Sequence, residues 1–204
     1  MKLYFLSLCM MLAVSFAAKA QSKLIFKDKF MYTDVQVFNE TKKHSIPSLI
    51  DTGCSLCVID SIFAIDSCGI KEDELQTIPV NQTKDKISSA FIDSMFFCGK
   101  TYHKVYCLVA DLTGLYQKYA PKFIVGANIL RSGAWKFDME KNIVEPYDYN
   151  NKTKGIIYKW KNHEDYPDVA IDYIILDSKV NEKKTRFAFD TGCLLYTSPS
   201  PRDR

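Results

Sequence analysis

Two stretches of this sequence decide its fold, and both end in the same four residues: Ser48-Leu49-Ile50-Asp51-Thr52-Gly53-Cys54 and Arg186-Phe187-Ala188-Phe189-Asp190-Thr191-Gly192-Cys193. Each stretch carries an apolar run that leads directly into Asp-Thr-Gly-Cys. At ordinary residue usage a single Asp-Thr-Gly arises by chance in roughly a few per cent of chains of this length. A lone copy is most simply a surface turn, because Asp and Gly favour turns. Two copies, each after an apolar run, make that interpretation a poor one.

Short apolar runs recur along the first 150 residues, several with the alternation of a half-buried strand. They predict strands at 24–38, 46–50, 58–59, 91–97, 105–109 and 123–126, and a hairpin made of 135–138 and 143–144. Short helical turns are expected at 61–65 and 115–119. Many short strands at regular spacing and few long helical patterns predict a mostly all-β, barrel-like lobe.

The pattern then restarts. The run Asp168–Leu176 resembles Asp34–Val37, and each leads through a polar turn into an Asp-Thr-Gly. The offset between the two motifs is 190 − 51 = 139 residues, which indicates an internal duplication. We therefore expect a first lobe at 24–147, a polar linker at 147–154, and the start of a second, incomplete lobe at 155–193.

The two ends of the chain have a different character. Residues 1–20 have the form of a signal peptide: a basic start, an apolar stretch over 3–17, and Ala18-Lys19-Ala20 as a small-x-small cleavage site. This predicts export to a periplasmic or extracellular compartment. Residues 194–204 do not parallel the residues after Cys54, and we interpret them as a non-native tail. No segment of the mature chain is long and apolar enough to span a bilayer.

Charge and cysteine content exclude several classes of protein. The formal charge of +3 falls to 3 − 2 = +1 without Lys2 and Lys19, and no basic stripe remains, which disfavours a nucleic-acid partner. Cys98 and Cys107 flank a predicted hairpin and are the best candidates for a disulfide. The Cys54-Ser55-Leu56-Cys57 run has redox-motif spacing but lacks the helix and the second ligand pair that redox or zinc chemistry needs. No metal and no cofactor are expected.

A pair of aspartates has its own chemistry. Two carboxyl groups about 3 Å apart cannot both ionise, so they share one proton. The ionised member can take a proton from water, and the protonated member can donate to a carbonyl oxygen. The glycine after each Asp-Thr allows a sharp turn, and the threonine hydroxyls can bond to the backbone of the opposite loop. Other acidic residues, such as Asp111 and Asp138, are expected to cap turns.

Three stretches carry a resemblance to a known family: Leu49–Gly53, Ile124–Gly126 and Phe189–Gly192. Over roughly residues 30–193 the sequence resembles secreted bacterial aspartic proteases of the retropepsin/pepsin clan, judged by motif order. The resemblance implies catalytic roles for Asp51 and Asp190. It implies that Thr52, Gly53, Thr191 and Gly192 support the catalytic loops, and that a strand of Ile124, Val125 and Gly126 threads beneath the first loop. The chain departs from the family at Cys54 and Cys193, where Ser, Thr or Ala is common.

The predicted function is that of an exported aspartic endopeptidase acting on an extended polypeptide. Because the second lobe breaks off after Cys193, we expect Asp190 to lack support, and the printed chain to be inactive or poorly folded after residue 155. Two alternatives remain open. The first lobe alone could form a retropepsin-like homodimer with Asp51 contributed twice, or the chain could be a non-catalytic exported binding domain with the same fold.

Overall fold

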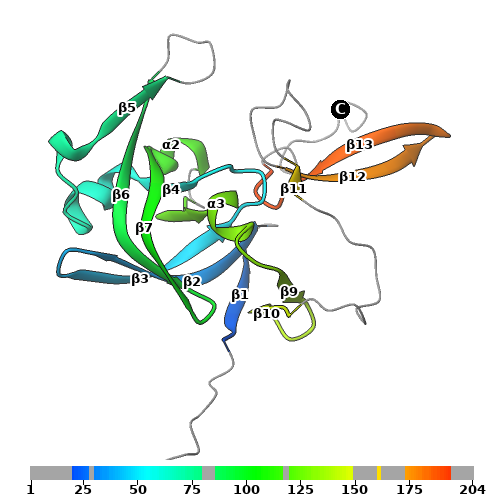
Figure 1. The fold of residues 1–204 in the computed structure, drawn as a ribbon, viewed down its shortest axis with the longest axis horizontal. Helices are drawn as coiled ribbons and strands as arrows, with labels where there is room; N and C mark the ends of the chain where they lie inside the picture. The colour runs from blue at the N-terminus through cyan, green and yellow to red at the C-terminus, as the bar shows by residue number, and fades with distance from the viewer. Residues whose placement is uncertain are drawn as a thin grey trace, which may run out of the picture.

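The computed structural model describes residues 20–27, 30–79, 86–116, 120–148, 160–161 and 173–193. The predicted signal peptide, apart from Ala20, lies outside the described residues. So do the predicted tail at 194–204 and most of the predicted linker. Figure 1 shows a compact β body on one side and a long hairpin that stands out from it.

Strands dominate the described chain. They are β1 (Ser22–Lys27), β2 (Phe30–Asn39), β3 (Lys42–Ile50), β4 (Cys57–Asp60), β5 (Gln76–Pro79), β6 (Lys86–Phe97), β7 (Lys100–Ala110), β8 (Phe123–Val125), β9 (Trp135–Asp138), β10 (Ile143–Pro146), β11 (Trp160–Lys161), β12 (Tyr173–Val180) and β13 (Lys183–Phe189). The helices are short turns: η1 (Phe63–Ser67), η2 (Glu72–Glu74), α2 (Leu112–Tyr116) and α3 (Ala127–Leu130). No helix in the described part of the chain is long and apolar enough to cross a membrane.

A closed ring of strands forms the body of the protein. The neighbours run β2-β3-β8-β4-β7-β6, and β6 returns to pair with β2, where Val37 lies opposite Met95. Closing a sheet in this way removes its open edges within the ring. The predicted mostly all-β, barrel-like fold is confirmed.

The side chains inside the ring follow from the alternation of its strands. On β7 the buried residues are Val105, Cys107 and Val109, while Tyr106 and Leu108 between them are less buried. Every residue of β4 is buried, because this strand lies between β7 and β8 in the middle of the sheet. The apolar core that results also contains Phe97 and Phe123, both fully buried.

Two aspartates cap turns, as the sequence predicts. Asp138 accepts a hydrogen bond from Lys141 N at 3.0 Å in the β9–β10 hairpin, which forms where expected. Asp111 accepts one from Gly114 N at 3.0 Å and so starts α2. The predicted helix at 115–119 was therefore placed too late, because it begins at the Asp111 cap. Residues 117–119 lie outside the described part of the chain.

The predicted pairing of Cys98 with Cys107 is wrong. Cys98 lies in the tight turn between β6 and β7, with φ at 48°, and Cys107 lies further along β7 opposite Ala90. The hairpin register therefore holds the two residues apart. All six described cysteines are free thiols, and Cys107 instead lies opposite Cys57 on the parallel neighbour β4.

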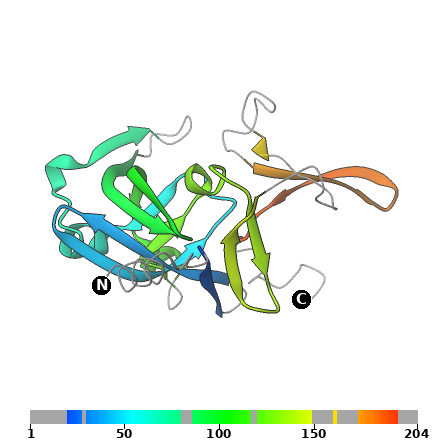
Figure 2. The ribbon, with the colours of Figure 1, turned by 60° about the horizontal axis from the view of Figure 1, so that its bottom comes forward.

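A second, three-stranded sheet of β11, β12 and β13 follows the barrel. In Figures 1 and 2 its β12–β13 hairpin projects away from the barrel. Both Asp-Thr-Gly motifs end the second strand of a hairpin with a two-residue turn. The turn is Glu40-Thr41 before the first motif and Asn181-Glu182 before the second. Each motif thus leaves the end of a strand, where a loop can be held rigidly.

We predict that Asp60→Ala destabilises the barrel by about 2–4 kcal/mol, since it leaves two buried N–H groups without an acceptor. Asp60 is 8% exposed, and its two carboxylate oxygens accept from Phe63 N at 3.0 Å and from Leu112 N at 3.2 Å. Urea unfolding of the variant measures the loss. Asp34→Ala, at an exposed position of β2, is the control and should change the free energy of unfolding by less than about 0.5 kcal/mol. Equal effects of the two variants would contradict the account.

Candidate active site

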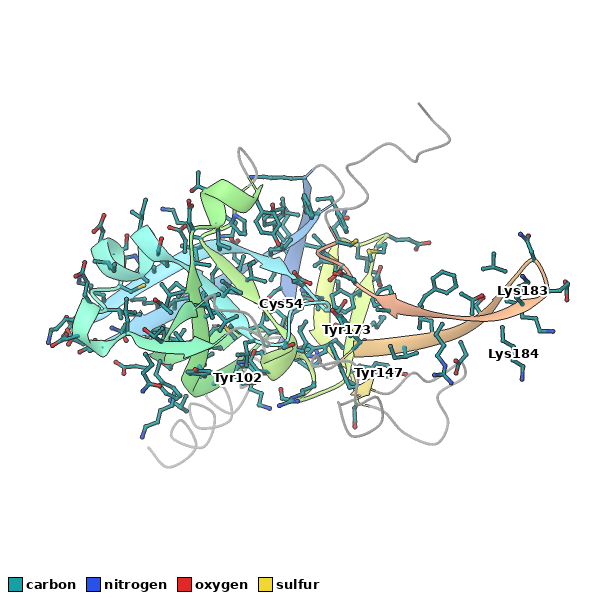
Figure 3. All side chains as sticks on the ribbon, turned by 90° about the horizontal axis from the view of Figure 1, so that it is seen from above. Cys54, Tyr102, Tyr147, Tyr173, Lys183 and Lys184 are labelled. Atoms are coloured by element: carbon teal, nitrogen blue, oxygen red, sulfur yellow. The ribbon has the colours of Figure 1, made fainter. Side chains whose placement is uncertain are left out.

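The two Asp-Thr-Gly loops meet where the barrel joins the β12–β13 hairpin. Figure 3 shows this junction, with Cys54 of the first loop near Tyr173 of β12. Asp51 follows β3 of the barrel, and Asp190 follows β13 of the small sheet. The structure thus brings together two residues that are 139 positions apart in the sequence.

Four hydrogen bonds made by the two threonines hold the loops together. Thr52 Oγ1 donates to Phe189 O at 2.8 Å, and Thr191 Oγ1 donates to Ile50 O at 2.8 Å. In return, Thr52 N donates to Thr191 Oγ1 at 3.0 Å, and Thr191 N donates to Thr52 Oγ1 at 3.1 Å. Each hydroxyl therefore bonds the backbone on either side of the opposite aspartate. We call this set of four bonds the threonine clasp.

The glycines let the two carboxyl groups approach each other. Gly53 N donates to Asp51 Oδ1 at 2.8 Å, and Gly192 N donates to Asp190 Oδ1 at 2.9 Å. A Cβ built on Gly53 would overlap the carboxyl group of Asp190, and one built on Gly192 would overlap that of Asp51. Each carboxyl thus lies against the opposite loop's glycine, in space that any side chain would fill.

The predicted loop-backing strand lies beneath the first loop. Ile124 and Val125 of β8 pair in parallel with Leu49 and Ile50 of β3, and Asp51 N donates to Val125 O at 3.1 Å. A Cβ on Gly126 would overlap the carbonyl of Leu56, so the chain after the motif packs directly on this glycine. Asp51 is consequently fixed from below by the barrel.

Burial raises the pKa of Asp51 to about 6, with the negative charge of Asp190 as the next cause. Hydrogen bonds from the backbone N–H groups of Gly53 and Cys54 act in the opposite direction, because they stabilise the ionised form. Asp51 is 7% exposed. The arrangement therefore favours a pair that carries a single negative charge in mildly acidic solution.

The two cysteines that follow the motifs are half-buried thiols. Burial raises the pKa of Cys54 to about 12, and the charge of Asp51 adds to the effect. Its Sγ donates to Leu56 O at 3.1 Å and so bonds the backbone of its own loop. Cys54 therefore stays a neutral thiol beside the carboxyl pair.

Sequence reasoning missed two tyrosines near the pair. Tyr116 of α2 is 9% exposed and packs edge-on against Phe30, with ring centroids 5.8 Å apart. Its pKa is raised by burial and then by the charge of Asp51, and burial and the charge of Asp190 similarly raise the pKa of Tyr173. In sequence these tyrosines resemble ordinary core aromatics, so no local signal marks them.

No cluster of three or more His, Cys, Asp or Glu side chains in the described ranges is placed to hold a metal ion.

Comparison with known proteins finds a likeness among solved structures. Neither a scan against protein-family models nor a search of curated proteins finds a match. Among solved structures, the chain is similar to the crystal structure of a retropepsin-like aspartic protease from Rickettsia conorii. The two are 18% identical in sequence, the match covers 61% of this chain and 87% of that chain, and the TM-score is 0.44.

We predict that Thr52→Val breaks half of the threonine clasp. Valine removes the donor to Phe189 O and the acceptor for Thr191 N, which should cost about 1–3 kcal/mol. Thr52→Ser keeps the hydroxyl and should retain most of the stability. Hydrogen exchange at the amides of 190–193 measures the release of the second loop. Equal protection of these amides in the valine and serine variants would show that the hydroxyl does not hold the loop.

We further predict that the protein loses stability as the pH rises from about 4 to about 6. The folded pKa of Asp51 lies above the ordinary aspartate value of 3.8, so in this window the native state binds more protons than the unfolded chain. The full difference corresponds to about 3 kcal/mol at 1.36 kcal/mol per pH unit. Urea unfolding at several pH values should show the fall in wild type and a flatter profile in Asp51→Asn. Superimposable profiles would contradict the assignment.

Proposed function

We propose that this protein is an aspartic-type endopeptidase in which Asp51 and Asp190 share one proton. The observation that carries the proposal is the clasped pair of loops, which holds two carboxyl groups against each other's glycine. The raised pKa of Asp51 supports it, because a shared proton is what the chemistry of the pair requires. The similarity to a retropepsin-like fold is in keeping with this reaction class but does not carry it.

The reaction follows from the protonation of the pair. The ionised carboxylate takes a proton from a water molecule as the water oxygen bonds to the scissile carbonyl carbon. The other carboxyl donates its proton to the carbonyl oxygen, which gives a neutral tetrahedral diol. On collapse the C–N bond breaks, the carboxyl that took the proton from water donates it to the leaving nitrogen, and the other carboxylate takes a proton from a diol hydroxyl, which becomes part of the new carboxylic acid. The pair thus returns to its starting state. The mechanism requires one proton on the pair, so activity should be highest below about pH 6.

The proposed substrate is an extended polypeptide that lies across the junction of the two loops and bonds partly through its backbone, as an added strand does. Export is part of the proposal, and the signal-like residues 1–20 support it.

The homodimer alternative differs in the source of the second carboxylate. In this structure, Thr52 bonds to Thr191 of the same chain, and the carboxyl group of Asp190 lies against Gly53. From the sequence we expected Asp190 to lack support and the chain to be inactive. Thr52 bonds the backbone on both sides of Asp190, and β13 leads into it, so we now propose that this chain is active. We therefore propose a dyad formed within one chain.

Cleavage of an unstructured protein such as casein at pH 4–6 tests the proposal. Asp51→Asn and Asp190→Asn should each lower kcat/KM by at least about 1000-fold, since each removes one half of the proton-transfer pair. Asp66→Asn, at an exposed position of η1, is the control and should keep full activity.

The other outcomes are distinguishable. Activity that survives Asp190→Asn, is lost in Asp51→Asn and falls on dilution would point to the homodimer. A folded wild-type chain that cleaves no peptide, yet retains an extended peptide in a binding assay, would point to the non-catalytic domain. Either result would overturn the proposal.

A further inference from the structure

Asn128, at the start of α3, joins three parts of the barrel that the catalytic motifs do not include. Its side-chain Oδ1 accepts from Cys57 N at 2.8 Å, and its Nδ2 donates to Tyr106 O at 3.0 Å. Its backbone N donates to Ser55 O at 3.0 Å, and the preceding Ala127 N donates to Cys54 O at 2.7 Å. One residue and its neighbour thus bond to almost every peptide unit of residues 54–57.

These contacts need the asparagine side chain in particular. The segment 54–57 runs from the first Asp-Thr-Gly to the start of β4 and is not itself paired until Cys57 meets Cys107 on β7. An acceptor is required for Cys57 N and a donor for Tyr106 O, at the two ends of one short side chain. The amide of asparagine supplies both, whereas Asp or Leu of similar size supplies one or neither.

The segment that Asn128 holds also reaches the carboxyl pair. Gly53 N donates to Asp51 Oδ1 at 2.8 Å, and the backbone N–H of the next residue, Cys54, lowers the pKa of the same carboxyl group. Ala127 N donates to the carbonyl of that same Cys54. This bond holds the peptide unit that follows Cys54, so the position of the Cys54 backbone beside the carboxyl group depends on where α3 and the segment lie. A shift of the segment would move the Cys54 N–H relative to the carboxyl group and so weaken its stabilisation of the ionised Asp51.

We propose that Asn128 is a positioning residue for Asp51. Asn128 holds residues 54–57 so that the Cys54 N–H stays directed at the carboxyl group of Asp51. Its consequence for turnover rests on the proposed function. Its effect on the proton affinity of Asp51 does not, because that affinity can be measured in a protein that cleaves nothing.

The test is the pKa of Asp51, followed by carboxyl-carbon NMR across pH 3–8 in wild type and in Asn128→Ala. Displacement of the Cys54 N–H from the carboxyl group should raise this pKa by about 0.5 to 1 pH unit, since an N–H directed at the charged form favours ionisation. The matched control is Asn39→Ala. Asn39 is also a buried asparagine whose side chain bonds a backbone carbonyl, that of Cys68 at 3.2 Å, outside the segment 54–57 and the Asp-Thr-Gly loops. This control should lower stability without moving the pKa of Asp51.

An unchanged Asp51 pKa in a folded Asn128→Ala protein would overturn the proposal and leave Asn128 a purely structural residue. Equal changes in both variants would also overturn it. If Asn128→Ala does not fold, Asn128→Ser offers a smaller change and should give a rise of the same sign. Where the wild type is active, the basic limb of its pH–rate profile should move upward with the pKa. An inactive wild type would count against the proposed function, while the titration would still decide the role of Asn128.

Discussion

Two carboxyl groups placed against each other repel once both ionise, and the rest of this site is organised around holding them there. The threonine clasp does so with hydroxyls that both donate and accept, so each bonds a carbonyl and an N–H of the opposite loop. Because all four bonds join backbone to side chain, the clasp fixes the loops and not merely the carboxyl groups. A salt bridge would act differently, since a nearby cation would favour ionisation of the carboxyl groups.

The barrel holds the first Asp-Thr-Gly loop in place, and the threonine clasp joins the second loop to it. β8 lies between β3 and β4, and Val125 accepts from the backbone N of Asp51, so the first aspartate is part of the hydrogen-bonded sheet. Gly126 leaves room for the backbone of Leu56 to pack against it, and the side chain of Asn128 donates a hydrogen bond to Tyr106 O of β7. The first Asp-Thr-Gly loop is thus held before and after the motif by the same short piece of chain, residues 125–128.

Sequence reasoning succeeded where the signal was local. Apolar alternation predicted the mostly β fold and the β9–β10 hairpin. The apolar run that ends at Gly126 predicted a strand, and the family resemblance implied its place beneath the first motif, where β8 pairs with β3. It failed where register or long-range contact decides. The Cys98–Cys107 pairing was wrong because hairpin register, which separates those residues, is invisible in the spacing of two cysteines. Asn128 and Tyr173 were missed because a polar residue after a strand, or an aromatic one within it, has the same local pattern whatever it contacts.

The two halves of the site are not equivalent, and this asymmetry follows from their supports. Behind Asp51 lies a closed barrel with a buried core, whereas Asp190 ends β13, whose side chains are mostly exposed in the described chain. The backbone N of Asp51 bonds to β8. The bonds described for the second loop are those of the clasp and the Gly192 N–H. The position of Asp190 therefore depends on the clasp far more than that of Asp51 does. A weakened clasp should move the second carboxyl away from the first, and the buried Asp51 would then titrate without its neighbour's charge.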